Sequence, residues 1–348
     1  MSLSKDKMDE VFGQLDKDST VGILVQQSPD PDCLGAASGF ATLLKQTYGL
    51  SSKIYHFGEI SHPQNKSMKN ILHITLYDGN DFNIDDVSAT VVLDTDLEST
   101  GFKSSKFTKV DVRIDHHELD RDEEPTLEDV RPNVGSTCAI VWEYLKDYNI
   151  DLSECPDVAT AMIIGIKTDT LDFASPNSSE LDREAFRDLL PFVNKESLAR
   201  VIKFPLPREV FELEELAYKN KNERNTTLVS FIGELTPHSR DMISTIADRF
   251  VRMAGITTVV IMAIIDNHLQ ASIRNDDARV DINDLCAKVF GKKFGGGKPQ
   301  GGSAGARLPV GNNFQYINTK EVRDKVVEEI VFTFTSKVFE VLGEEEKE

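Results

Sequence analysis

Cysteine is scarce in this sequence, and its positions do not suggest cross-linking. The four residues are scattered, with no paired spacing, at Cys33, Cys138, Cys155 and Cys286. Disulfide frameworks and zinc knuckles depend on close, repeated spacings, so neither is expected. The pattern is typical of a reducing compartment and predicts a cytoplasmic protein.

Long hydrophobic runs are also missing. The longest apolar stretch, residues 257–265 (TTVVIMAII), is too short to span a bilayer and suits a buried strand. The first residues, MSLSKDK, contain no apolar signal core. We therefore expect a soluble protein with no membrane partner.

Basic residues are fewer than acidic residues in this sequence. The 39 Lys and Arg residues face 58 Asp and Glu residues, which gives a formal net charge of -19. Affinity for duplex nucleic acid comes largely from Lys and Arg on phosphates, so long duplex DNA is not an expected partner. A small anionic substrate held by metals and a few cations is compatible with this charge.

The length of 348 residues favours two domains. Strand-like and helix-like segments alternate from about residue 20 to 190, which predicts a doubly wound α/β domain with a mainly parallel sheet. Residues 118–128 (ELDRDEEPTLE) read as a solvated loop. The expected strands are 21–25, 52–57, 91–93 and 110–114, and the expected helices are 35–47, 136–148 and 157–165.

A second, smaller α/β domain is expected after a helical connector. We place the catalytic domain at 1–190, the connector at 191–225 and the smaller domain at 226–348, with the active site in the cleft between the two domains. The smaller domain is expected to contain strands 229–232, 259–265 and 269–274, and helices 239–253, 282–290 and 319 to the end.

Acidic residues and histidines stand at the ends of four apolar segments. In chain order they are Asp30 and Asp32, Asp94 and Asp96, Asp115-His116-His117, and Asp169. Open parallel sheets bind ligands at the carboxyl edge of their strands. Carboxylates gathered there would repel one another unless cations lay between them, so we infer a site for two divalent metals. Such sites carry out phosphoryl chemistry.

Each of these residues also has an ordinary structural explanation. Asp30 can cap the helix that follows it, and Asp94, Asp96 or Asp169 can be a polar residue at the end of an element. The histidine pair is harder to explain in this way, since His116 and His117 after an Asp at a strand end are uncommon in a plain loop, and Asp115 could orient a metal-binding histidine. The coincidence at four successive ends favours the metal site.

One glycine-dense segment, residues 295–305 (GGGKPQGGSAG), follows the expected helix 282–290. Such a segment can be a flexible linker, a tight turn or a phosphate cradle, and its position between a helix and more ordered sequence disfavours the linker. Lys298 lies within it and Arg274 lies on the preceding strand, and both side chains suit phosphate recognition.

Taken together, these motifs resemble the DHH phosphoesterase superfamily, in which a DHH-associated domain follows the catalytic domain. PDPDCLG, VVLDTD, DHH and GIKTDTLDF match the four catalytic motifs, and ASIRND and GGGKPQGGSAG match the associated domain. The superfamily includes RecJ-like exonucleases, family II pyrophosphatases and enzymes acting on cyclic dinucleotides. The layout is most similar to the oligoribonucleases that also dephosphorylate 3′-phosphoadenosine 5′-phosphate (pAp).

The resemblance implies a role for each matched residue. Asp30 would bind one metal and Asp32 the other, with Asp94, rather than Asp96, as the bridge. His116 and Asp169 would complete the second metal site. The implied catalytic residues are His117, on the scissile phosphate, with Asp115, Arg274 and Lys298. The implied substrate-binding residues are Ser272, Arg274, Gly295, Gly296, Gly297 and Lys298.

Two positions depart from the family pattern. Gln26 stands where the family usually has a metal-binding histidine, and an amide oxygen is a weaker ligand for transition metals. Lys298 replaces the histidine of the usual Gly-Gly-Gly-His, which keeps a positive charge but removes a proton donor for neutral pH.

The resemblance implies a divalent-metal-dependent phosphodiesterase or phosphatase that works through a two-metal-activated hydroxide. Mn²⁺ is the favoured metal and Mg²⁺ the alternative. Expected substrates are short single-stranded oligonucleotides, pAp-like nucleotides or linear dinucleotides. The alternatives are an exopolyphosphatase or pyrophosphatase, or a catalytically weakened nucleotide-binding protein. A homodimer is compatible with the family.

Overall fold

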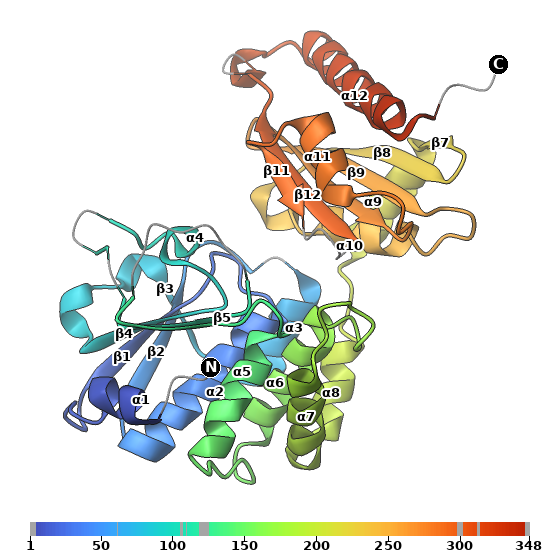
Figure 1. Cartoon of the computed structure of the whole chain (residues 1–348). Helices are drawn as coiled ribbons and strands as arrows, with labels where there is room; N and C mark the ends of the chain where they lie inside the picture. The colour runs from blue at the N-terminus through green and yellow to red at the C-terminus, as the bar shows by residue number, and fades with distance from the viewer. Residues whose placement is uncertain are drawn as a thin grey trace. The chain divides into compact units, whose positions relative to one another are not determined.

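The computed structural model describes residues 5–60, 62–104, 107–108, 110–117, 125–297, 302–311 and 314–344. The chain divides into two compact units, Met1–Pro205 and Leu206–Glu348, which are described separately (Figure 1). The expected connector, 191–225, contains one helix of each unit, α8 (Lys195–Ile202) and α9 (Arg208–Lys219). Within the described residues, no helix has the length and apolar character needed to cross a membrane.

The first unit is built on a parallel sheet of six strands in the order β3-β2-β1-β4-β5-β6. The chain runs outward from β1 to β3 and then returns to place β4 on the other side of β1, so the strand order reverses there. Ligands of doubly wound sheets bind at this switch point. The predicted fold class is confirmed. The strands are β1 (Thr20–Leu24), β2 (Ser51–His56), β3 (Leu76–Asp78), β4 (Ala89–Leu93), β5 (Val112–Asp115) and β6 (Leu127–Val130).

Helices α2, α5 and α6 pack together in this unit. Gly35 allows α2 to approach α6 closely, because a Cβ at this position would lie 2.8 Å from the carbonyl oxygen of Ala161. Gly165 allows the same at the far end, where a Cβ would lie 2.8 Å from the Cα of Asp32. This crossing brings the start of α2 to the end of α6. The helices are α1 (Lys5–Phe12), α2 (Pro31–Leu43), α3 (Pro63–Ile71), α4 (Leu97–Thr100), α5 (Thr137–Asp147), α6 (Pro156–Asp169), α7 (Glu180–Leu189) and α8.

Two apolar cores cover the two faces of this sheet. Val112 and Ile114 belong to the core that α2, α5 and α6 complete, whereas Val92 belongs to a smaller cluster with Leu24 and Tyr55. Successive side chains of a strand point to opposite faces, so Arg113 lies on the Val92 side of β5.

Strand β6 is the main departure from the expected secondary structure of this unit. Residues 127 and 128 of the expected loop begin this strand, which pairs in parallel with β5. Residues 118–124 of that loop lie outside the described part of the chain. The strand Leu127–Val130 has only two apolar residues, and its pairing with β5 stabilises a segment whose sequence pattern is weak.

The second unit has a mixed sheet of six strands in the order β11-β12-β10-β9-β8-β7, in which only β8 and β9 pair in parallel. Helices α11 and α12 pack on one face and α9 and α10 on the other (Figure 1). The predicted second α/β domain is confirmed. Its further elements are β7 (Asn222–Arg224), β8 (Thr227–Glu234), β9 (Thr258–Ile265), β10 (His268–Asn275), β11 (Gly295–Gly297), β12 (Ser303–Pro309), α10 (Met242–Phe250), α11 (Ile282–Phe290) and α12 (Lys320–Leu342).

Candidate metal centre

Asp94 directly follows β4 and is held in an unusual backbone conformation. Its φ is +60°, in the left-handed region that costs a non-glycine residue energy and is found at functional sites. Its carboxylate is buried, and Oδ1 accepts a hydrogen bond of 2.8 Å from the hydroxyl of Thr137. Within the described residues, Oδ2 has no hydrogen-bond partner. A buried oxygen without a partner is costly unless a cation or proton satisfies it.

His116 follows β5, the neighbour of β4, and has a defined tautomer. Its Nδ1 lies 3.1 Å from the carbonyl oxygen of Val134, which can only accept, so Nδ1 carries the proton. In the neutral ring, Nε2 therefore presents a lone pair. This atom lies 3.2 Å from Oδ2 of Asp169, 3.6 Å from Oδ1 of Asp94 and 4.0 Å from Oδ2 of Asp32. A carbonyl that orients a histidine in this way is typical of metal sites.

Asp32 lies in the first turn of α2, fully buried against the start of α5. Its carboxylate accepts hydrogen bonds from the backbone N–H groups of Thr137, at 2.6 Å, and Cys138, at 3.0 Å. Burial, and then the charge of Asp169, raise the pKa of Asp32 to about 6. The site therefore holds a carboxyl group whose ionised form is partly stabilised by a helix N-terminus.

Negative charge predominates strongly at this site. Burial, followed by the negative charges of Asp32, Asp30 and Asp169, raises the pKa of Asp94 well above its usual range. Two sets of ligand atoms each lie within 4.8 Å of one another, Asp32–His116–Asp169 and Asp94–His116–His117. Clustered oxygens and an oriented imidazole fit divalent cations such as Mn²⁺ or Mg²⁺.

Two other acidic residues cap helices. Asp30 is the N-cap of α2 and accepts from the backbone N–H of Cys33 at 3.0 Å, while its charge still contributes to the raised pKa values of Asp32 and Asp94. Asp96 is the N-cap of α4 and accepts from the N–H of Ser99 at 2.7 Å. Asp30 therefore combines capping with a place near the cluster.

Gln26 lies just beyond β1 and is half-buried. The expected role of this residue as a weak ligand stays a prediction.

His117 and Asp115 form a tight unit beside the cluster. Oδ1 of Asp115 accepts both the backbone N–H of His117, at 3.0 Å, and its ring Nδ1–H, at 2.9 Å. Asp115 is fully buried, whereas the side chain of His117 is 30% exposed. The carboxylate thus fixes a ring that solvent can reach.

Several residues that support this centre were not anticipated from the sequence. Thr137 and Val134 orient Asp94, Asp32 and His116, as described above. Asp182, on α7, is fully buried and accepts from Gly135 N and Ser136 Oγ, both at 2.8 Å. The sequence shows Ser136 as a helix N-cap, but it gives no signal that this turn holds the carboxylates.

The predicted substrate-binding residues of the second unit lie on β10 and β11. Arg274 donates from Nη1 to Ser272 Oγ at 2.9 Å and from Nε to Asp248 Oδ1 at 2.5 Å, so Asp248 is an unanticipated partner. Gly295, Gly296 and Gly297 form β11 and pair with β12. The glycine-rich segment thus begins as a strand, and the N–H of Gly297 donates to Asn283. Lys298 lies outside the described residues.

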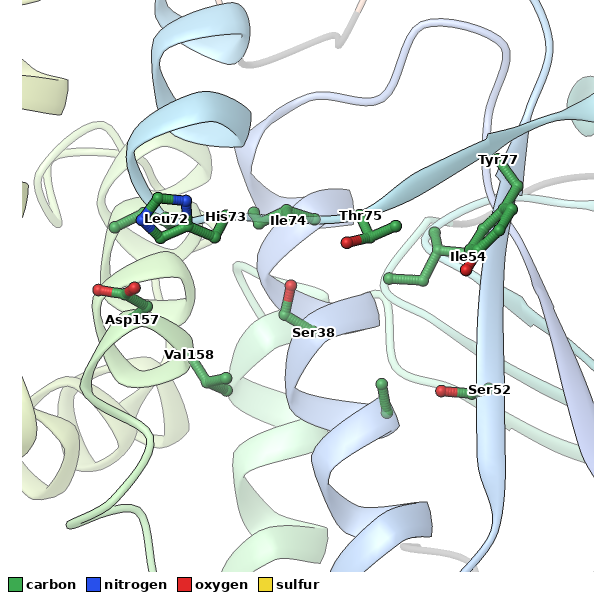
Figure 2. Close-up of a pocket in the computed structure, with 11 residues that line it drawn as sticks. Ser38, Ser52, Ile54, Leu72, His73, Ile74, Thr75, Tyr77, Asp157 and Val158 are labelled. Carbon is green, nitrogen blue, oxygen red and sulfur yellow. The ribbon is translucent and has the colours of Figure 1, made fainter. Parts of the chain in front are cut away.

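A separate cavity of about 350 Å³ opens in the first unit between α2, β2 and the start of α6 (Figure 2). Its lining includes Ser38, His73 and Asp157 but none of the clustered residues. It is therefore not the metal centre.

The fold and this cluster define an α/β protein with a His/Asp metal centre at the switch point of a parallel sheet. Residues 20–166 form a DHH-family domain, since the family model described as "DHH family, N-terminal domain" matches them. The resemblance stated from the motifs is confirmed.

Two relatives and one solved structure are similar to this chain. An uncharacterized protein of Methanocaldococcus jannaschii is 31% identical over 334 residues, which are 96% of this chain and 66% of the relative. A probable manganese-dependent inorganic pyrophosphatase of Lactobacillus delbrueckii is 24% identical over 173 residues, 48% of this chain and 53% of the relative. This chain therefore spans about two thirds of the first relative and about half of the second.

The crystal structure of an exopolyphosphatase-related protein from Bacteroides fragilis matches with a TM-score of 0.65 and 17% identity. The match covers 97% of this chain and 99% of that chain. At this identity the likeness concerns the fold.

Proposed function

We propose that this protein is a divalent-metal-dependent phosphoric ester hydrolase. The observation that carries the proposal is the buried Oδ2 of Asp94, which has no hydrogen-bond partner among the described residues, within a cluster of three carboxylates and His116. Such an arrangement is stable only with cations or extra protons. The DHH-family domain supports cations for phosphoryl chemistry.

Asp30, Asp32, Asp94, His116 and Asp169 would hold two metal ions, with Gln26 next to the first. When bound, the ions would supply charge stabilisation for the phosphoryl group and a water of lowered pKa. Mn²⁺ is the favoured metal, since the similar pyrophosphatases are named as manganese-dependent. Mg²⁺ is the alternative because Gln26 offers a hard oxygen.

Other residues of the chain would bind the phosphate groups of the substrate. His117 would contact the scissile phosphate through Nε2, since Asp115 occupies its Nδ1–H. In the second unit, Arg274, Ser272 and the β11 glycines would bind a further phosphate, together with Lys298. Arg274 suits this role because Asp248 and Ser272 hold its guanidinium in one orientation.

We propose short oligonucleotides, pAp-like nucleotides or linear dinucleotides as substrates. The net charge of -19 disfavours long nucleic acids, whose binding needs an extended basic surface. Pyrophosphate or polyphosphate is the second candidate, supported by the pyrophosphatase relatives that match about half of this chain.

A substrate panel tests the proposal. Release of phosphate and nucleotide is measured in Mn²⁺ and in Mg²⁺ with a dinucleotide, a pentanucleotide, pAp, a cyclic dinucleotide, pyrophosphate and polyphosphate, and His116→Ala serves as control. Turnover of one nucleotide class that is lost in the control supports the first candidate. Turnover of only the inorganic substrates supports the second. Binding without turnover under either metal would overturn hydrolysis and leave a nucleotide-binding protein.

A further inference from the structure

Arg113 is a buried cation next to the DHH motif. It lies on β5 two residues before Asp115, so both side chains point to the same face of the strand. Its side chain is only 1% exposed, and Asp115 is fully buried. On this face lies the apolar cluster that includes Val92, the residue in register with Arg113 on β4.

A chain of polar contacts runs from Arg113 to His117. Nη2 of Arg113 lies 3.4 Å from Oδ2 of Asp115, while the other oxygen, Oδ1, accepts both hydrogen bonds from His117. On its other side, Arg113 donates from Nη1 to Glu128 at 3.0 Å. Glu128 is the residue in register with Arg113 on β6. The two oxygens of Asp115 thus contact different residues: Oδ2 contacts Arg113 and Oδ1 contacts His117.

Stability alone does not account for this arrangement. Taking a guanidinium and a carboxylate out of water costs several kcal/mol each, and replacing a buried ion pair by apolar residues is often neutral or stabilising. A buried pair can instead fix one geometry. Here the ion pair fixes the orientation of the Asp115 carboxylate, and this carboxylate determines the tautomer of His117.

We propose that Arg113 is a positioning residue for His117 and acts through Asp115. Its Nη2 donor holds Oδ2 of Asp115, so that Oδ1 faces the imidazole. His117 then keeps its proton on Nδ1 and leaves Nε2 for substrate. The catalytic consequence rests on the role given to His117 in the proposed function, but the positioning itself does not.

A neighbouring network provides a matched control. Arg131 is also largely buried and pairs with Asp129 at 2.7 Å and with Glu143 at 2.8 Å, and Asp129 also accepts from Tyr144. This network has the same chemistry, and it meets the DHH motif through the backbone, where the N–H of Arg131 donates to the carbonyl oxygen of Asp115 at 2.9 Å. Glu143→Gln therefore weakens a similar ion pair and leaves this backbone hydrogen bond to Asp115 in place.

The test is the tautomer of His117 in the metal-free protein. Nitrogen-15 histidine NMR on wild type, Arg113→Met, Glu128→Gln and Glu143→Gln distinguishes Nδ1–H from Nε2–H, with His117→Gln used to assign the signal. We expect Nδ1–H in wild type and in Glu143→Gln, and a shift toward Nε2–H in Arg113→Met, with a smaller shift in Glu128→Gln. Glu128 is about half exposed, so this variant remains testable if Arg113→Met does not fold.

An unchanged His117 signal in Glu128→Gln and in folded Arg113→Met would overturn the proposal. With the substrate that the panel identifies, kcat of Arg113→Met should fall roughly 10–100-fold with little change in KM, and Arg113→Lys should recover part of it. A shifted tautomer in a protein without hydrolase activity would leave the positioning role intact and refute only the proposed function.

Discussion

Asp94 and His116 come from adjacent parallel strands, and Oδ1 of Asp94 lies 3.6 Å from Nε2 of His116. The β4–β5 pairing sets this approach, because Asp94 comes one residue and His116 two residues after the last pair, Leu93–Ile114. Thr137 and Val134 then fix the carboxylate and the ring from the start of α5 and the turn before it. Asp94 and His116 are thus held by one sheet edge and by the start of α5, while the start of α2 and the end of α6 supply Asp32 and Asp169.

Replacing Asp94 should stabilise the metal-free protein and weaken its binding of metal. In the metal-free protein, Asp94→Asn should raise the free energy of unfolding, because it removes a carboxyl group whose pKa is raised by burial and by the neighbouring negative charges. Asn also tolerates a positive φ well. Thermal unfolding with and without Mn²⁺ measures both effects.

In the same experiment Mn²⁺ at 100 times its Kd should stabilise wild type by about 2.7 kcal/mol and Asp94→Asn much less. Asp96→Asn is the control, because Asn also serves as an N-cap and should leave metal stabilisation unchanged. Equal stabilisation of wild type and Asp94→Asn would contradict the assignment of Asp94.

The hydroxyl of Thr137 should affect metal affinity without being a ligand. Thr137→Val removes the hydrogen bond to Asp94 and should weaken Mn²⁺ binding roughly 10–100-fold, whereas Thr137→Ser should retain it. Calorimetric titration of both variants measures the difference. Similar affinities for Thr137→Val and Thr137→Ser would show that this hydrogen bond does not orient the carboxylate.

Metal binding should compete with protons at Asp32. Its pKa of about 6 in the metal-free fold means that this carboxyl is mostly protonated at pH 5.5 and must lose its proton to bind a cation. Mn²⁺ affinity should therefore fall from pH 7.5 to 5.5, with proton release visible as a buffer-dependent heat of binding. Equal affinity at the two pH values would argue against Asp32 as a ligand.

The same pKa has the opposite effect on the stability of the metal-free protein. The folded pKa, about 6, lies above the ordinary pKa of 3.8, so the folded state binds more protons between these values. The contribution of Asp32 to the free energy of unfolding should then rise as pH falls from about 6 toward 4. The difference between wild type and Asp32→Asn, measured by denaturant unfolding across this range, isolates this contribution.

Gln26 offers a gain-of-function test. Gln26→His should tighten Mn²⁺ binding and raise activity if the first metal position limits the protein, because imidazole is a better ligand for transition metals than an amide oxygen. The exposed neighbour supplies the control, Gln27→His, which should change neither property. If the two variants have the same Mn²⁺ affinity as wild type, Gln26 is not at the metal position.

Much of the site was predictable because its residues end apolar segments. Val91–Leu93 and Val110–Ile114 predicted buried strands, and parallel strands bring their carboxyl ends together, so Asp94 and His116 were expected to meet. Asp169 could be placed at a helix end because it, too, follows an apolar segment. Local pattern and topology are sufficient for such residues.

The supporting contacts were not predictable, since they depend on packing between distant segments. Thr137 reaches Asp94 only because α5 starts against α2 and β4, and Arg113 reads as an ordinary polar residue until β6 supplies Glu128. Residues Gly295–Gly297 form a strand because β12 pairs with them, which the glycine composition alone does not reveal.

The most direct test of the metal centre is a crystal structure of the protein grown with Mn²⁺, with anomalous diffraction data collected at the manganese edge. We predict two anomalous peaks among Asp32, Asp94, His116 and Asp169, with Asp94 contacting both ions. Well-ordered side chains at this cluster without an anomalous peak at saturating Mn²⁺ would contradict the account.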